Sequence, residues 1–224
     1  MSDVGNHSKG CTTAAIIPAY NEAERIEKTV QSVGKYVDET LVVDDASTDD
    51  TGARARAAGA TVLTQPENQG YIAAIKRGFR AAETDVVVTI DADGEFPPDR
   101  IPDLVHPVCE RAADMVQGHR AAIVRPSEQF LTWLAGWGGP VGDSGTGLRA
   151  LRTDLAQALD LDGKCICGIF SLEVLGRGGK IQEIPVQLNQ IDKPRGIAWY
   201  HGTQVFYVVQ ALVRTAFSLW KDDT

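Results

Sequence analysis

The sequence predicts a single α/β domain built on a mainly parallel sheet, and three observations support this. In the first 91 residues, four short apolar runs alternate with segments whose apolar residues recur at helical spacing, the pattern of consecutive strand–helix units. Each run ends in a polar loop, and in a parallel sheet with right-handed crossovers such loops leave from one edge. The 224 residues, 43% of them hydrophobic, suffice for one domain with a sizeable core.

The first two units are defined by apolar runs and by helix start and stop signals. Residues 14–19 are the first predicted strand, and the helix that follows ends near Gly34. Residues 40–43 are the second strand. Residues 47–50 (STDD) then supply capping side chains for a helix that Gly59 closes.

The third and fourth units repeat this order. Residues 61–64 are the third strand, and residues 68–70 (NQG) form a turn into a helix over 71–82. The fourth strand starts at Val86 and ends at Asp91. It is apolar without polar alternation, as expected for a parallel strand that is buried on both faces.

The second half of the chain is less regular. The elements predicted there are a helix from about Asp99, a strand at 114–118, a helix around 129–137, a strand at 180–188 and a helix at 203–220. Pro185 places the late strand at a sheet edge or a bulge. The last helix has a wide apolar arc, which suits either a membrane-surface helix or a helix packed on the domain's own core or in a dimer.

The fourth strand ends in three acidic residues at alternate positions, Asp91, Asp93 and Glu95. Clustered carboxylates repel one another and are costly to desolvate unless a cation lies between them. Oxygen ligands of this kind suit Mg²⁺ or Mn²⁺, which usually also hold substrate phosphates. The sequence therefore predicts a metal and diphosphate site here, the alternative being a solvated acidic turn.

Composition narrows the function classes. The net charge of −8 argues against a nucleic-acid binder, which would usually show a basic footprint. No window reaches 18 uninterrupted apolar residues, so no transmembrane helix is expected. The four cysteines lack the spacing of a zinc site, and reduced thiols are the expectation for a cytoplasmic protein. Cys165 and Cys167 are expected in a strand or loop.

Several segments together resemble a known family. Residues 17–22 (IPAYNE), 43–51 (VDDASTDDT), 68–70 and 91–93 resemble family 2 glycosyltransferases of the GT-A fold, a Rossmann-like mixed sheet flanked by helices. Four further segments resemble the dolichol-phosphate mannose synthases in that family: 91–98 (DADGEFPP), 118–120 (GHR), 143–149 (DSGTGLR) and 183–186 (EIPV). The resemblance spans residues 13–200, which it implies are a GT-A domain. The polar residues 1–12 are expected to be a flexible leader, and the apolar pattern predicts a C-terminal amphipathic helix within 201–224.

The resemblance also implies a donor site. The residues it assigns to the nucleotide sugar are Pro18, Tyr20, Glu22, Asp44, Asp45, Asp91, Arg120 and Arg125. Asp91 and Asp93 would hold the metal, with Glu95 standing where the family commonly has Gln. The two arginines would neutralise phosphates, which suits a planar, always-charged guanidinium.

On the acceptor side the resemblance implies Ser144, Arg149, Lys193 and Arg195. The chain departs from the family there, because residues 193–198 (KPRGIA) replace the signature Arg-x-x-Gly-x-Ser. The residues expected to act in catalysis are Asp93, Arg120 and Asp143. His119 and His201 are interpreted as ordinary loop histidines, and Trp133 and Trp137 as packing residues.

The implied reaction moves a hexose, mannose or glucose, from a GDP- or UDP-sugar to a polyprenyl (dolichyl) phosphate with inversion. A phosphate acceptor is already an anion and needs only alignment. A saccharide hydroxyl acceptor would need a base, with Asp143 as the first candidate and Glu173 as the second. We expect a cytoplasmic protein at the cytoplasmic face of the membrane, with peripheral membrane contact and no nucleic-acid partner.

Two other functions fit the sequence less well. A sugar-phosphate nucleotidyltransferase would carry a glycine- and arginine-rich loop after the first strand, which residues 18–22 lack. A non-catalytic nucleotide-sugar-binding module has no evident reason to keep both Asp91 and Asp93.

Overall fold

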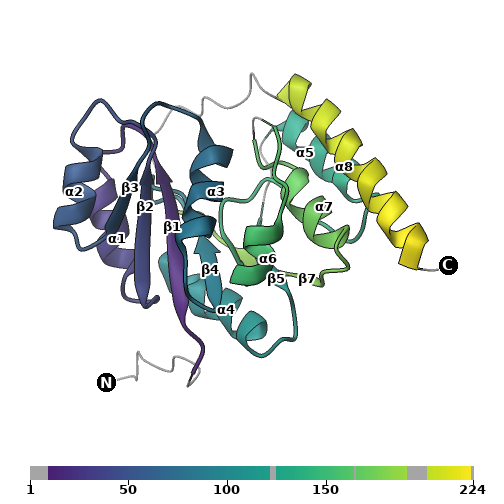
Figure 1. Ribbon diagram of the computed structural model, residues 1–224, viewed down its shortest axis with the longest axis horizontal. Coiled ribbons are helices and arrows are strands. Elements are labelled where there is room, and N and C mark those ends of the chain that lie inside the picture. Colours follow the sequence, from purple (N-terminus) through teal and green to yellow (C-terminus); the bar gives the residue numbers. More distant parts are fainter. Residues whose placement is uncertain (1–9, 122–124, 164, 191–200, 223–224) are drawn as a thin grey trace.

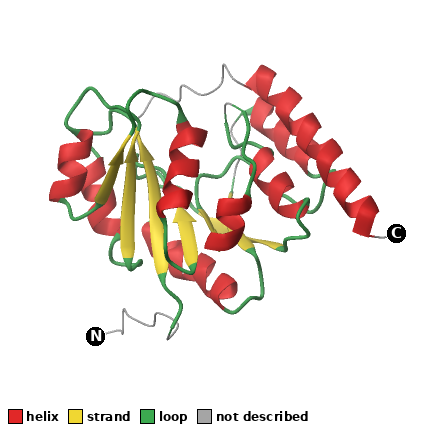
Figure 2. Cartoon of the chain, in the orientation of Figure 1, coloured by secondary structure: helices red, strands yellow, loops and turns green. Residues whose placement is uncertain are grey.

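Seven strands form one sheet in the computed structural model, which describes residues 10–121, 125–163, 165–190 and 201–222 (Figures 1 and 2). Their order across the sheet is β3-β2-β1-β4-β6-β5-β7. The strands are β1 (Thr13–Ala19), β2 (Glu39–Asp44), β3 (Thr61–Thr64), β4 (Val86–Thr89), β5 (Met115–Arg120), β6 (Arg149–Arg152) and β7 (Ile181–Val186). All neighbouring pairs are parallel except those of β6, which runs antiparallel to β4 and β5.

Helices cover both faces of this sheet (Figure 2). They are α1 (Ile26–Val33), α2 (Thr51–Ala57), α3 (Tyr71–Ala81), the 3₁₀ turn η1 (Pro98–Arg100), α4 (Ile101–Cys109), α5 (Pro126–Ala135), α6 (Thr153–Ala158), α7 (Ile169–Leu175) and α8 (His201–Asp222). Residues of α1, α2 and α4 share one core with one face of β1, and residues of α3 and α5–α8 share a second core with the other face. Because β1 is buried on both faces, its sequence is apolar without alternation.

The predicted mainly parallel α/β fold is confirmed. Pro185 lies in β7, which is the last strand in the sheet order, so the prediction of an edge position is confirmed as well. The elements that sequence patterns did not predict are β6, α6 and α7, which have four, six and seven residues. β6 has two arginines in its four residues, so it lacks the apolar run by which the other strands were found.

One expectation about side chains was wrong. Trp133 and Trp137 were expected to be packing residues, but they are 56% and 69% exposed. Trp133 points outward because Leu131, Thr132, Leu134 and Ala135 form the buried face of α5, and Trp137 lies just past the end of that helix. The predicted capping segment before α2 acts through Asp49, whose Oδ1 accepts the backbone N–H of Thr51, the first residue of α2, at 3.0 Å, while the N-cap residue Asp50 makes no side-chain cap hydrogen bond.

Helix α8 packs against α5 and α7 through a buried face that includes Gln204, Val208, Ala211 and Thr215. The side-chain amide of Gln204 donates to the carbonyl oxygens of Cys165 (2.8 Å) and Cys167 (3.3 Å), which ties α8 to the loop before α7. Of the helices that the structure describes, none combines the length and apolar character needed to cross a membrane.

The expectation of reduced thiols was wrong for one pair of cysteines. A disulfide joins Cys11, just before β1, to Cys109, the last residue of α4, across a sequence separation of 98 residues. Cys165 and Cys167 are free and buried, and they lie in a loop, which was one of the two predicted locations (strand or loop). The cross-link closes a large loop that spans the first four strands.

Removing this cross-link should lower stability, because a disulfide that closes a long loop reduces the entropy of the unfolded chain. We expect the Cys11→Ser/Cys109→Ser variant to lose about 2–4 kcal/mol in free energy of unfolding. Urea denaturation without a thiol reductant measures this loss, and excess reductant should bring the unmodified protein down to the variant's level. Equal stability of the two proteins without reductant would show that the bond contributes nothing.

Candidate active site

The acidic residues after β4 lie at the carboxyl edge of the sheet, against the glycine-rich segment 136–147. Asp91 Oδ1 accepts a hydrogen bond from the hydroxyl of Tyr71, the first residue of α3, at 3.0 Å. Gly147 lies so close that a Cβ added there would be 2.2 Å from Asp91 Oδ2. The Thr89 hydroxyl also donates to the Gly147 carbonyl oxygen at 3.0 Å. The end of β4 and the glycine-rich segment therefore form one packed unit.

The electrostatics of this strand end favour a bound cation. Burial, together with the nearby charge of Asp93, raises the pKa of Asp91 to about 6, even though the Tyr71 hydrogen bond and Arg149 lower it. A divalent cation would relieve the cost of holding both carboxylates ionised, so Asp91 and Asp93 fit such an ion.

The expected three-carboxylate set is not assembled. Within the described ranges, no three His, Cys, Asp or Glu side chains lie together as a metal-binding group. Asp93 Oδ1 instead accepts the backbone N–H of Glu95 at 3.0 Å. Mg²⁺ is commonly held by one or two carboxylates, with waters and substrate phosphates as its other ligands.

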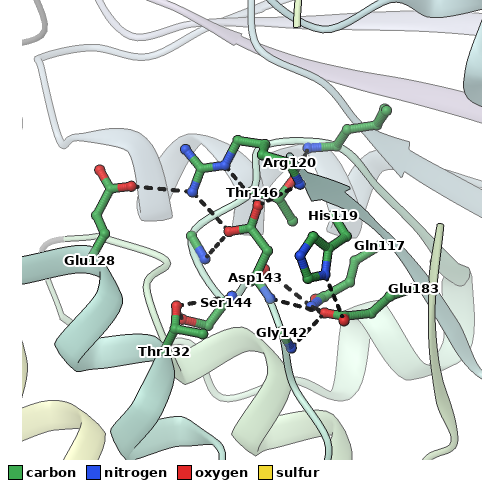
Figure 3. A network of polar contacts seen from close by, with 12 residues as sticks. Gln117, His119, Arg120, Glu128, Thr132, Gly142, Asp143, Ser144, Thr146 and Glu183 are labelled. Atoms are coloured by element: carbon green, nitrogen blue, oxygen red, sulfur yellow. Dashed lines mark hydrogen bonds and ion pairs between the residues drawn. The ribbon is translucent and has the colours of Figure 1, made fainter. Parts of the chain in front are cut away.

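A second cluster surrounds Asp143, which has no exposed surface (Figure 3). Its Oδ2 accepts hydrogen bonds from the backbone N–H (3.0 Å) and Nε (2.7 Å) of Arg120, and its Oδ1 accepts one from Nη2 of the same guanidinium (2.8 Å). Arg120 Nη2 also reaches Glu128 Oε2 on α5 at 3.2 Å. Burial lowers the pKa of Arg120, but the bonds to Asp143 and Glu128 outweigh burial and raise it, so the guanidinium stays charged.

Glu183 of β7 holds the segment that carries Asp143 (Figure 3). Its Oε1 accepts hydrogen bonds from the backbone N–H groups of Gly142 (2.9 Å) and Asp143 (3.0 Å) and from the side-chain amide of Gln117 (2.6 Å). Its Oε2 lies 3.1 Å from Nδ1 of His119. Burial raises the pKa of Glu183, but these bonds outweigh it and lower the pKa below its ordinary value.

Two of the residues predicted on the acceptor side lie beneath this segment. Arg149 is fully buried, donates from Nη2 to the Ser144 carbonyl oxygen at 3.0 Å, and stacks 4.6 Å above the Phe170 ring. Burial lowers the pKa of Arg149, and among the described residues its Nε and Nη1 have no hydrogen-bond partner. The Ser144 hydroxyl is buried as well, 2.8 Å from that of Thr132 on α5. Lys193 and Arg195 lie outside the described residues.

The residues predicted to contact the nucleotide lie at the ends of β1 and β2. Pro18 is buried in β1 opposite Val43, Tyr20 is 45% exposed, and Glu22 is buried with Arg25 at 3.5 Å. The turn between Tyr20 and Glu22 is held by Asn21 (φ 57°). Its side-chain oxygen accepts the backbone N–H of Thr48 at 2.9 Å.

Asp44 and Asp45 shape the neighbouring loops rather than cap α2. Asp44 Oδ1 accepts the backbone N–H of Ser47 at 3.0 Å. Asp45 accepts hydrogen bonds from the side-chain amide of Gln65 (2.6 Å) and from the backbone N–H groups of Gln69 and Gly70 (both 2.8 Å), just before α3. Asp45 thereby positions the helix that carries Tyr71.

Other candidates have local partners. Arg125 Nη1 lies 3.6 Å from Glu128 Oε1. Glu173, the second candidate base, pairs with Arg177 of its own helical turn and with Arg214 of α8 (3.4 Å), and it accepts the backbone N–H of Asp160 (3.2 Å). The side chain of His201 lies outside the described part of the chain. A cleft of about 520 Å³ lies at the amino ends of β1 and β4, lined in part by Cys11 and Asp85, at the opposite edge of the sheet from Asp91.

Sequence reasoning missed four residues that organise the site: Tyr71, Gln117, Glu128 and Glu183. Glu183 lies in residues 183–186, a segment that carries the family resemblance, but no role was predicted for its carboxylate. Tyr71 is 20 positions from its partner Asp91, and Gln117 is 26 positions from its partner Asp143. Glu128 lies on α5, and spacing alone does not show that this side of the helix faces Arg120.

Comparisons with known proteins agree with this geometry. The model of the family described as glycosyl transferase family 2 matches residues 14–165. An undecaprenyl-phosphate mannosyltransferase from Micrococcus luteus is 34% identical over 201 residues, which cover 76% of this chain and 81% of that protein. A dolichol-phosphate mannosyltransferase from Pyrococcus furiosus is 26% identical over 223 residues, covering 90% of this chain and 62% of that protein.

A solved structure shows the same fold. Glucosyl-3-phosphoglycerate synthase from Mycobacterium tuberculosis, in complex with Mn²⁺, UDP-glucose and phosphoglyceric acid, aligns with a TM-score of 0.75 at 26% identity. The alignment covers 92% of this chain and 80% of that one.

Proposed function

The chain belongs to glycosyl transferase family 2, and on that premise we propose that it transfers a hexose from a nucleotide diphosphate sugar to a polyprenyl phosphate, with inversion at the anomeric carbon. The observation that carries the acceptor class is the 34% identity to an undecaprenyl-phosphate mannosyltransferase over most of both chains. The donor is a GDP- or UDP-sugar, and the sugar is mannose or glucose. The reaction takes place at the cytoplasmic face of a membrane.

The donor binds where the loops after β1, β2 and β4 meet. Pro18, Tyr20, Glu22 and the Asp44–Asp45 pair form the nucleotide side, and Tyr20 offers an exposed ring to the base. We assign Arg120, the last residue of β5, and Arg125 to the diphosphate side, where the negative charge of the leaving group grows. Electrostatic stabilisation of such charge is usually the largest catalytic contribution.

Asp91 and Asp93 would hold a divalent cation, Mg²⁺ or Mn²⁺, with the diphosphate oxygens completing its shell, and Glu95 stands beside them. Such an ion supplies Lewis-acid stabilisation of the leaving diphosphate. The Tyr71 hydroxyl keeps Asp91 in place through its hydrogen bond. A glycine at 147 leaves the room that this carboxylate occupies.

Asp143 acts by holding Arg120 rather than as a general base. Both of its carboxylate oxygens accept hydrogen bonds from the Arg120 guanidinium, which leaves it poorly placed to accept a proton from an acceptor hydroxyl. Glu173 is likewise occupied by Arg177 and Arg214. A chain whose candidate bases are engaged in ion pairs suits an acceptor that arrives as an anion, and Ser144, Arg149, Lys193 and Arg195 form the acceptor side.

A panel of donors and acceptors tests the proposal. The protein is incubated with Mn²⁺ or Mg²⁺, with GDP-mannose, GDP-glucose or UDP-glucose, and with undecaprenyl phosphate, dolichyl phosphate, 3-phosphoglycerate or a mannose oligosaccharide. We expect one donor to give a lipid-linked hexose.

Three results would contradict the proposal. Product with 3-phosphoglycerate alone would assign the acceptor that the name of the Mycobacterium tuberculosis synthase states. Product with the saccharide alone would assign a hydroxyl acceptor. Donor binding without any product would indicate a binding module.

A further inference from the structure

Helix α5 and the turn that follows it present a row of aromatic side chains to solvent. Phe130, Trp133 and Trp137 are 48%, 56% and 69% exposed. Their rings contact one another in sequence, with centroids 5.7 Å apart between Phe130 and Trp133 and 5.0 Å apart between Trp133 and Trp137. The spacing i, i+3 places Phe130 and Trp133 on one side of the helix. Trp137 lies two residues past the end of α5 and continues the row through its contact with Trp133. We call these three residues the aromatic ladder.

The opposite side of the same helix contacts the site. Glu128 bonds Arg120 at 3.2 Å, and the Thr132 hydroxyl lies 2.8 Å from that of Ser144. At 100° per residue, Glu128 and Thr132 lie across the helix from Phe130 and Trp133. The site and the ladder are therefore separated by one helix diameter, about 10 Å with side chains.

The ladder is uncharged. Between residues 126 and 137 the only ionisable side chain is Glu128, which is engaged with Arg120 and Arg125. Tryptophan and phenylalanine on an uncharged surface suit the interface between lipid headgroups and acyl chains. Exposed apolar patches on a soluble domain mark interaction sites.

We propose that the aromatic ladder is the surface by which this protein docks on a lipid bilayer, an inference that rests on the proposed lipid-phosphate acceptor. A polyprenyl phosphate keeps its chain in the bilayer and its phosphate among the headgroups, a layer about 5–8 Å deep on each side. With the ladder seated at the acyl boundary, the site lies about one helix diameter, roughly 10 Å, above it, at the outer side of the headgroup layer that holds the phosphate. A second copy of the chain could cover the rings, but would not bring the lipid phosphate to Arg120.

Vesicle binding tests the proposal. Flotation with phosphatidylcholine vesicles compares the unmodified protein with the F130S/W133S/W137S variant, each checked for an unchanged thermal unfolding midpoint. We expect the variant to lose at least tenfold in vesicle partition. Binding of the unmodified protein should change little between low and high salt, because the ladder has no charge. Failure of the unmodified protein to float, or equal flotation of the variant, would overturn the proposal.

The matched control is a second variant on α8, whose exposed apolar residues Phe206, Val209 and Val213 have the same spacing. We expect F206S/V209S/V213S to retain most vesicle binding, and loss of binding in this variant alone would move the docking surface to α8. Sedimentation velocity tests whether a second copy of the chain covers the rings instead. If the unmodified protein is a dimer and the ladder variant is a monomer, the rings form a dimer interface and the docking proposal is wrong.

Kinetics separate this inference from the proposed function. The ladder variant should show a raised KM for undecaprenyl phosphate in vesicles and an unchanged kcat/KM for a short, water-soluble prenyl phosphate. Ladder-dependent flotation without any lipid-linked product would overturn the proposed function but leave the docking surface standing. Equal kinetics of the two proteins on vesicles would overturn the docking role.

Discussion

Replacing Asp93 by Asn should lower kcat at least about a thousandfold, equivalent to about 4 kcal/mol of transition-state stabilisation. The reason is that Asp93, with Asp91, is proposed to hold the cation that neutralises the leaving diphosphate. The charge of Asp93 also contributes to the raised pKa of Asp91, so the variant relieves repulsion between the two carboxylates. Its thermal unfolding midpoint should therefore be unchanged or higher, which separates a catalytic defect from misfolding.

Asp99 offers the matched control for this variant. It is an exposed acid in η1, six residues after Asp93, and Asp99→Asn should keep nearly full activity. Activity of the unmodified protein in excess EDTA should fall as far as that of the Asp93 variant and return when Mn²⁺ is added. Full activity of Asp93→Asn, or full activity in EDTA, would refute the metal assignment.

Replacing Arg120 by Met should destabilise the fold by about 3–5 kcal/mol, because it leaves Asp143 buried without its cation. Asp143 has no exposed surface and takes three hydrogen bonds from Arg120, one of them from the backbone. Arg120 itself pairs with Glu128 as well. Urea denaturation measures the loss, and activity should fall below detection.

A double variant separates the structural role of this pair from its chemical role. Arg120→Met/Asp143→Asn removes both charges while an amide oxygen still accepts the backbone N–H of Gly145, which lies 3.3 Å from Asp143 Oδ1. It should recover at least half of the lost stability and none of the activity, because no guanidinium remains to meet the phosphates. Recovered activity would show that Arg120 serves only to neutralise Asp143.

The fold could be predicted because each of the first four strands has a local signature. The apolar runs, their polar exits and the helical spacing between them are properties of neighbouring residues, so they are legible in one sequence. The edge position of Pro185 could also be predicted locally, because proline has no backbone N–H to donate to a second neighbouring strand. The short antiparallel β6 was missed because its pairing with β4 and β5 depends on residues 30 or more positions away.

The site was predicted only in part, for the same reason. Residue type and position identified Asp91, Asp93, Arg120 and Asp143 as candidates, but not that Arg120 and Asp143 pair with each other across 23 positions. The role of Glu183 in holding Gly142 and Asp143 needs a contact across about 40 positions. Such contacts form only when β7 is placed beside β5.

The sequence by itself determined the order of strands and helices, the acidic end of β4 and membership of a glycosyltransferase family, because these depend on residue type and local spacing. The tertiary structure decided which polar groups are partners and which surfaces remain open. It joined Tyr71 to Asp91 and Arg120 to Asp143, and it closed the Cys11–Cys109 bond. It also turned Trp133 and Trp137 outward, because the packing of α5 on the core, and not its composition, selects the face that water or lipid meets.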